Sequence, residues 1–142
     1  MSHAVERIVL FFETLTPASL ARCGEFYCED AAFKDPFNEV RGVPAIEGIF
    51  RHMYDNLHEP RFIVTGRVAE GEQVFLTWDF RFRFRRHHPG TEQVIRGASH
   101  LLLAPDGRIR VHRDYWDAAE ELYEKLPVVG GLMRWLKRRA NS

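Results

Sequence analysis

The segment over residues 73–86 (QVFLTWDFRFRFRR) alternates apolar and polar side chains along its whole length. A period of two is typical of a β-strand that buries one face, so this segment constrains the fold more than any other. Short turn sequences connect it to three more segments typical of strands, which are 61–70, 92–104 and 108–116. Long strands joined by short turns predict an antiparallel meander.

The first half of the chain has the periodicity of helices. One apolar stripe has helical spacing and is formed by Val5, Ile8, Val9 and Phe12. A second helix is expected to begin at Thr16-Pro17 and to carry Leu20, Cys23 and Tyr27. A third is expected to begin near Val43, after a short strand over 31–35. Helices followed by antiparallel strands predict the α+β class, with a curved sheet wrapped around three N-terminal helices.

Size and charge narrow the classes of function. A chain of 142 residues and 16.6 kDa fits one domain over 1–142. Lys+Arg and Asp+Glu are both 20. A nucleic-acid-binding domain is usually basic, so no nucleic-acid partner is expected. Aromatic residues make up 13% of the chain, which is enough to line an apolar cavity as well as a core.

The segment 118–142 is expected to be a C-terminal helical extension. Its end (VVGGLMRWLKRR) is basic and amphipathic, which fits packing on the domain or on a second subunit. The alternative is an anchor on anionic lipid. Membrane contact is the less favoured reading because Gly130-Gly131 weakens a helix.

Cysteine and histidine usage indicates the compartment and the cofactors. Cys23 and Cys28 cannot form a disulfide scaffold, and the N-terminus has no signal-peptide pattern, so a cytoplasmic protein with reduced thiols is expected. No His pair stands at zinc-site spacing beside Cys or carboxylates. The sequence therefore predicts no metal site and no cofactor.

Three motifs follow one another along the chain: FYCEDAAFKDPF, then Arg41-Gly42 before the third helix, and finally APDGRIRVHRDYWD. In these motifs the chain resembles the nuclear transport factor 2-like superfamily, in its SnoaL-like and ketosteroid-isomerase-like branch. The resemblance implies a cone-shaped sheet around helices, with a deep apolar pocket at the open end. It also implies a homodimer through the sheet. Function varies widely on this fold, so the resemblance does not fix a reaction.

The resemblance gives Asp35 a role, because it matches the general base of ketosteroid isomerases in an Asp-Pro-Phe motif after a short strand. Such a base takes a proton from the carbon next to a carbonyl, and an apolar pocket raises its pKa toward the working range. Asp-Pro is also a common turn pair. Asp35 could therefore only end the strand and cap the loop, and both readings stay open.

The other isomerase positions carry different chemistry here. The resemblance places the two oxyanion-stabilising groups at Phe11 and Ser99. A Phe cannot donate a hydrogen bond, and losing one oxyanion donor costs about 10²–10³ in rate. True ketosteroid isomerase activity is therefore not expected. Tyr27 matches a tyrosine that supports the oxyanion network and keeps a hydroxyl in the pocket.

A second polar set follows from alternation in the last strand. The resemblance turns Trp116 toward the cavity, and then His112 and Asp114 face it too, with Ser99 beside them. An imidazole and carboxylates can supply both an acid and a base when their environments separate their pKa values. Asp114 could instead pair with a nearby arginine, and His112 could be exposed or satisfied in the core. A slip of one residue would turn both away.

Together these residues outline a pocket for a small hydrophobic molecule. The catalytic candidates are Asp35, His112, Asp114 and Tyr27, and the expected walls are Phe11, Phe50, Met53, Trp78, Phe80, Phe82, Ser99, Leu101 and Trp116. Three functions stay open. The first is a cofactor-independent isomerase, cyclase or dehydratase-like lyase with Asp35 as base. The second is a ligand-binding module without catalysis, and the third is a protein-interaction module.

Overall fold

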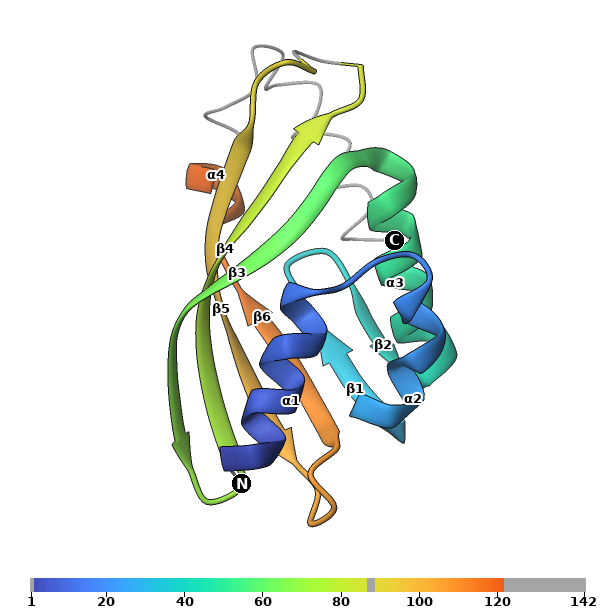
Figure 1. Cartoon of the computed structure of the whole chain (residues 1–142), viewed down its shortest axis with the longest axis vertical. Helices are drawn as coiled ribbons and strands as arrows, with labels where there is room; N and C mark the ends of the chain where they lie inside the picture. The colour runs from blue at the N-terminus through green and yellow to red at the C-terminus, as the bar shows by residue number, and fades with distance from the viewer. Residues whose placement is uncertain (1, 87–88, 122–142) are drawn as a thin grey trace.

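Six strands form one curved sheet in the order β2-β1-β6-β5-β4-β3 (Figure 1). The computed structural model describes residues 2–86 and 89–121, so most of the predicted extension over 118–142 lies outside the described residues. The strands are β1 (Tyr27–Lys34), β2 (Glu39–Arg41), β3 (Leu57–Glu70), β4 (Gln73–Phe84), β5 (Gln93–Leu103) and β6 (Ile109–Tyr115). Neighbours from β3 to β6 pair antiparallel, which confirms the meander. The sheet is nevertheless mixed, because β1 runs parallel to β6.

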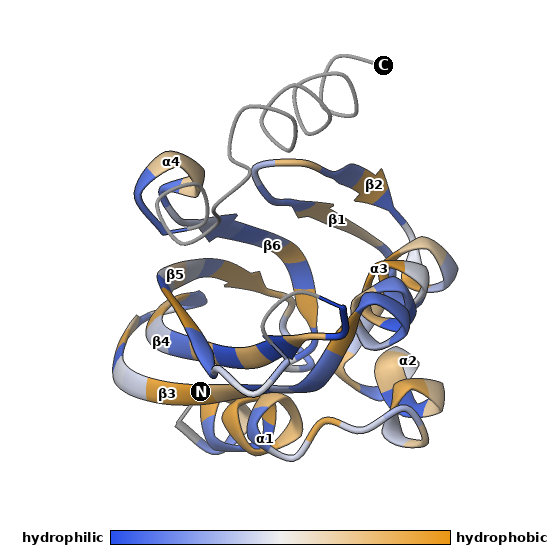
Figure 2. Ribbon diagram, turned by 90° about the horizontal axis from the view of Figure 1, so that it is seen from above, coloured by the Kyte–Doolittle hydropathy of each residue, from blue (hydrophilic) through white to orange (hydrophobic). Residues whose placement is uncertain are grey.

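Three helical segments near the N-terminus close the open side of the curved sheet, which confirms the α+β class (Figure 2). The helices are α1 (Ser2–Glu13), η1 (Ser19–Arg22), α2 (Cys23–Phe26), α3 (Val43–Asn56) and α4 (Ala118–Glu121). The apolar stripe of α1 is buried, as its spacing predicts. None of the helices in the described part of the chain is long and apolar enough to span a membrane.

The predicted second helix stops earlier than its pattern indicated. It is divided into η1 and α2, and Tyr27 already begins β1. Tyr27, Ala31 and Phe33 are all buried along one side of that strand. Burial of this strand face competes with continuation of the helix, and tertiary packing decides between them.

Strand β3 begins at Leu57, earlier than the predicted start at residue 61, and runs through Pro60. The pairing with β4 shifts register between His58 and Arg61, and Glu59 has a φ of 53°. A proline cannot donate to the ladder, so it is tolerated at such an irregularity in an edge strand.

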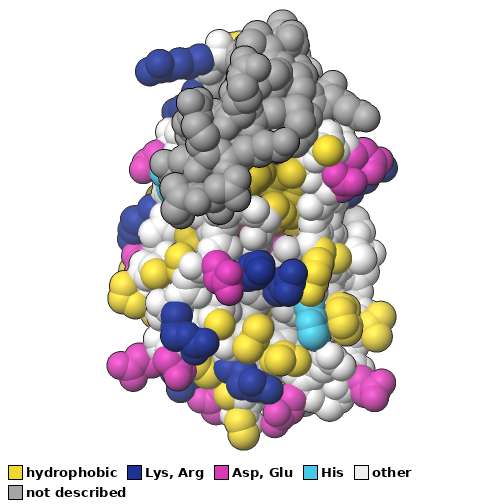
Figure 3. Space-filling view, turned by 180° about the vertical axis from the view of Figure 1, so that it is seen from behind, with side chains coloured by type: hydrophobic (Ala, Val, Ile, Leu, Met, Phe, Trp, Pro, Cys, Tyr) yellow, Lys and Arg dark blue, Asp and Glu magenta, His cyan; other side chains and the backbone are white. Residues whose placement is uncertain are grey.

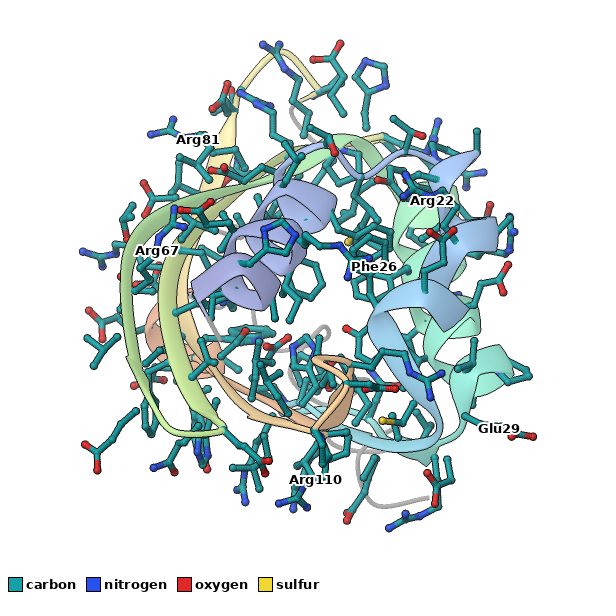
Figure 4. All side chains as sticks on the ribbon, turned by 60° about the horizontal axis from the view of Figure 1, so that its bottom comes forward. Arg22, Phe26, Glu29, Arg67, Arg81 and Arg110 are labelled. Carbon is teal, nitrogen blue, oxygen red and sulfur yellow. The ribbon has the colours of Figure 1, made fainter. Side chains whose placement is uncertain are left out.

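Side chains separate by face, with Arg81 and Arg110 outside the ribbon and Phe26 facing the interior (Figure 4).

Candidate functional site

A cavity of about 280 Å³ opens between α3 and the inner face of the sheet. Its lining residues are Phe33, Asp35, Asn38, Ile49, Phe50, His52, Met53, Asn56, Leu57, Phe62, Trp78, Phe80, Ile95, Asp114 and Trp116. Ligand sites are mostly apolar cavities of about 300–1,000 Å³ with a few polar groups. This cavity is near the lower end of that range, so it suits a small molecule.

Trp78 lies across the sheet because its partner position is a glycine. In the pairing of β4 with β5, Trp78 stands directly opposite Gly97. A Cβ built on Gly97 would stand 2.4 Å from Cη2 of the indole, so only glycine leaves room for this ring. The indole Nε1 then donates to Ser99 Oγ at 2.9 Å, which fixes the ring at the cavity wall.

His112 connects the core to the cavity through both ring nitrogens. Its Nδ1 lies 2.7 Å from the Tyr27 hydroxyl oxygen, and its Nε2 lies 2.7 Å from Asp114 Oδ1. An ionised carboxylate can only accept, so Nε2 carries the hydrogen and Nδ1 accepts from Tyr27 in the neutral ring. Burial, and then the charge of Asp114, raises the pKa of Tyr27 well above its ordinary value, which keeps this hydroxyl a donor.

Asp114 is held by one of its two oxygens. Ser99 Oγ donates to Asp114 Oδ1 at 2.5 Å, and His112 Nε2 donates to the same oxygen. Among the described residues, Oδ2 has no hydrogen-bond partner, although the side chain is only 15% exposed. Asp114 lines the cavity, so the arrangement anchors one oxygen and leaves the other for a ligand.

Asp35 occupies the same cavity in a different environment. Its Oδ1 accepts from the backbone amides of Phe37 and Asn38, at 2.8 and 2.6 Å, and Asn38 Nδ2 reaches both oxygens at 3.1 Å. Burial raises the pKa of Asp35 above its ordinary value, these hydrogen bonds oppose the rise, and the charge of Asp114 adds to it. Pro36 ends the strand here. Asp35 therefore caps the turn, as the structural interpretation of the Asp-Pro pair expects, and it also lines the cavity, as the catalytic interpretation expects.

The structure places the expected wall residues at different depths. Phe50, Met53, Trp78, Phe80 and Trp116 line the cavity. Ser99 instead lines a smaller inner space of about 20 Å³, together with His112 and Asp114. The remaining candidates lie in the packed core, and these are Phe11, Tyr27, Phe82 and Leu101.

Three polar lining residues were not expected from the sequence. Asn38 binds Asp35 in the turn after Pro36, and the signal for it was the Asp-Pro turn pair. His52 and Asn56 are one helical turn apart on α3, and Asn56 Nδ2 donates to the carbonyl oxygen of His52 at 2.7 Å. Both residues lie only partly on the face of α3 that carries Met53. The apolar stripe of α3 therefore did not predict that they line the cavity. Among the described residues, no group of three or more His, Cys, Asp or Glu side chains could hold a metal ion.

Several solved structures are similar to this one. An LEH-like epoxide hydrolase from M. tuberculosis is 17% identical, with a TM-score of 0.72 over 96% of this chain and 97% of that chain. A protein from Catenulispora acidiphila with a ketosteroid isomerase-like fold, solved with trimethylamine, is 16% identical, with a TM-score of 0.71 over 84% of this chain and 88% of that chain. A protein from Jannaschia assigned as a SnoaL-like polyketide cyclase is also 16% identical, with a TM-score of 0.70 and the same coverage, 84% and 88%.

At these identities the likeness shows the fold alone. No curated protein matches the sequence significantly. The family model for the SnoaL-like domain matches residues 8–112, from Ile8 on α1 to His112 on β6. Since that match spans most of the chain, the chain belongs to the SnoaL-like domain family.

Proposed function

We propose that this SnoaL-like chain is an enzyme that moves protons on a small, mainly apolar, carbonyl-bearing substrate. The observation that carries the proposal is that Asp35 and Asp114 line one aromatic cavity in unlike environments. Two carboxyl groups with unlike environments can act as acid and base at one pH. The similar structures described as a cyclase and an epoxide hydrolase support an enzymatic role for a cavity on this fold.

Asp114 is the base in this proposal. Its Oδ1 is held by His112 and Ser99, so the carboxylate cannot rotate freely. Its Oδ2 is left to meet a substrate C–H. Tyr27 lies in the core and positions His112 by a hydrogen bond. Because His112 in turn holds Asp114, the effect of Tyr27 on Asp114 is indirect. A base that is already oriented avoids the cost of ordering it during the reaction.

Asp35 is the acid. Burial raises its pKa, so it holds a proton to a higher pH than an ordinary aspartate. The sequence alone favours Asp35 as the base. The proposal moves that role to Asp114 because three donors already occupy Asp35 Oδ1, whereas Asp114 has an oxygen left over.

The proposed step conserves protons within the cavity. Asp114 Oδ2 takes a proton from the carbon next to the carbonyl, and Asp35 gives its proton to the carbonyl oxygen, which leaves an enol. In each outcome the enol O–H proton returns to Asp35 and Asp114 gives up the proton it took. Delivery of the Asp114 proton to a different carbon isomerises the substrate, and its delivery to a departing leaving group gives elimination. Attack of the enol carbon on a second carbonyl closes a ring, and the new alkoxide oxygen takes the Asp114 proton. The first proton abstraction is common to all three outcomes, so it is the step to test.

Deuterium exchange tests that step without knowledge of the natural substrate. The full chain is incubated in D₂O with small cyclic ketones, such as cyclohexanone and 1-decalone, and loss of the α-proton signal is followed by NMR. We expect exchange above the buffer rate for at least one ketone that fits the cavity. Exchange at the buffer rate for the whole panel would contradict the proton-transfer proposal.

A second candidate function is a ligand-binding protein without catalysis. Phe11, at one oxyanion position of the isomerases, is 4% exposed and stacks on Phe26 at 4.1 Å, away from the cavity. The donors on Asp35 also fit a structural turn. Binding of a ketone without exchange would favour this function over the first.

The outer sheet face supports a homodimer, which we also propose. Its exposed apolar residues include Val68, Phe75 and Tyr115, and Phe75 is 45% exposed and stacks on His100 at 4.3 Å. Apolar side chains lie among charged ones on the face seen from behind (Figure 3). This band is the kind of surface that a second copy covers.

We therefore expect Phe75→Glu to weaken self-association at least tenfold, because an apolar contact worth about 1.5–3 kcal/mol is replaced by a buried charge. Light scattering coupled to size-exclusion chromatography gives the mass of each species. Leu10→Glu is the matched control, since Leu10 is 62% exposed but lies on α1. A monomeric wild-type protein, or an unchanged dimer in Phe75→Glu, would show that this face is not the interface.

A further inference from the structure

The two carboxylates of the cavity have no arginine or lysine partner in the described ranges. Some carboxylates elsewhere do have one, as in the pairs Glu47–Arg51, Glu92–Arg81 and Asp106–Arg108. Asp114 contacts His112 and Ser99, while Asp35 contacts Asn38 and backbone amides. No Lys or Arg belongs to the described lining of the cavity. Within the described lining, negative charge is therefore offset by dipoles and by the imidazole of His112 at Asp114 Oδ1, and by no arginine or lysine.

A ligand that fills the cavity displaces water from these groups and must replace it with a partner of its own. A charge away from water needs a partner of opposite sign or good hydrogen bonds. Hydrogen bonds satisfy Asp114 Oδ1 but leave Oδ2 without a donor among the described residues. A positively charged group on the ligand, placed beside Asp114, would supply that partner.

The walls of the cavity attract cations as well. They are largely aromatic and include Phe62, Trp78, Phe80 and Trp116. Ring faces carry negative potential, and tryptophan binds cations best. The arginines that lie over rings in the described structure, Arg7 and Arg22 at Phe26 and Arg113 at Tyr115, are all away from the cavity. The rings of the cavity are thus left without a protein cation.

We propose, as an extension that rests on the proposed function, that the substrate carries a positive charge: a protonated or quaternary amine joined to a small apolar body. Asp114 attracts the charge, and the rings enclose its alkyl groups. A neutral molecule of the same shape gains the apolar contacts but leaves the Asp114 carboxylate uncompensated. Charge, and not only size, therefore selects the substrate.

Choline and 3,3-dimethylbutan-1-ol test this inference, because they have the same shape and differ in whether the central atom is N⁺ or carbon. The ¹⁵N-labelled full chain is titrated with each at neutral pH, and the indole N–H signals of its tryptophans are followed by NMR. We expect choline to bind at least about tenfold more tightly. Asp114→Asn should remove most of that preference, and Asp30→Asn, at an exposed position on β1, should keep it. The carboxamide introduced by Asp114→Asn retains an acceptor oxygen for His112 and Ser99, so the fold is expected to survive.

Equal affinities for the two compounds would overturn the inference and leave the apolar cavity of the proposed function intact. Failure of both compounds to bind would also overturn it. The ketone exchange assay then judges the proposed function separately, because its probes are neutral.

Discussion

Asp114→Asn is expected to slow ketone α-proton exchange by about 10²–10⁴-fold, the usual contribution of a positioned acid or base. The carboxamide has nearly the shape of the carboxylate, and its oxygen can still accept from His112 and Ser99. Only the basic oxygen that faces the cavity is lost. The variant therefore separates the chemistry of Asp114 from its structural role.

The measurement is the exchange rate by NMR at fixed protein concentration, with the melting temperature recorded beside it. Asp30→Asn is the matched control, since it removes a carboxylate from an exposed position on β1. A rate within a few-fold of wild type in Asp114→Asn would remove Asp114 from the mechanism. A similar loss in Asp30→Asn would show that the effect is not specific to the cavity.

Gly97→Ala is expected to destabilise the fold by about 1–3 kcal/mol, the range for overpacked cores. The new Cβ would meet three atoms of the Trp78 ring at 2.4, 2.7 and 2.8 Å, distances that require the ring to move. The ring is held at its other side by the bond from Nε1 to Ser99. Movement therefore costs a buried hydrogen bond and also pushes the indole into the cavity.

Equilibrium urea unfolding gives the change in stability, and the Trp78 indole N–H signal reports whether the bond to Ser99 survives. Gly48→Ala is the control, because nothing lies within 4 Å of a Cβ at that exposed position on α3. It should stabilise the helix by about 0.5–1 kcal/mol. Equal effects of the two substitutions would mean that the indole does not need the space above Gly97.

Alternation predicted the sheet well because one face of each long strand is buried. The pattern of 73–86 became β4, and its apolar positions Val74, Leu76 and Trp78 are all buried. The same argument placed His112 and Asp114 on one face of β6. It could not show that Tyr27 reaches His112, because that contact depends on the parallel pairing of β1 with β6.

A period of two could not predict which side chains on the inner face border the cavity and which lie in the packed core. Phe80 and Phe82 share a face of β4, yet only Phe80 lines the cavity, while Phe82 is 2% exposed and contacts the rings of Phe80 and Phe84. Leu101 on β5 pairs with His112 on β6 and is fully buried, although the sequence predicted that it forms part of the cavity wall. A pattern identifies the face of a strand, and the curvature of the sheet then decides which residues on that face border empty space.

The central claim is that Asp35 and Asp114 act as an acid–base pair in one cavity, and the pH dependence of ketone exchange tests it most directly. If Asp35 supplies the proton, the rate falls as pH rises through its pKa, which burial places above the ordinary value of an aspartate. We predict that wild type shows this falling limb and that Asp35→Asn loses it at a lower overall rate. A rate that does not change across this pH range, or a limb that persists in Asp35→Asn, would contradict the account.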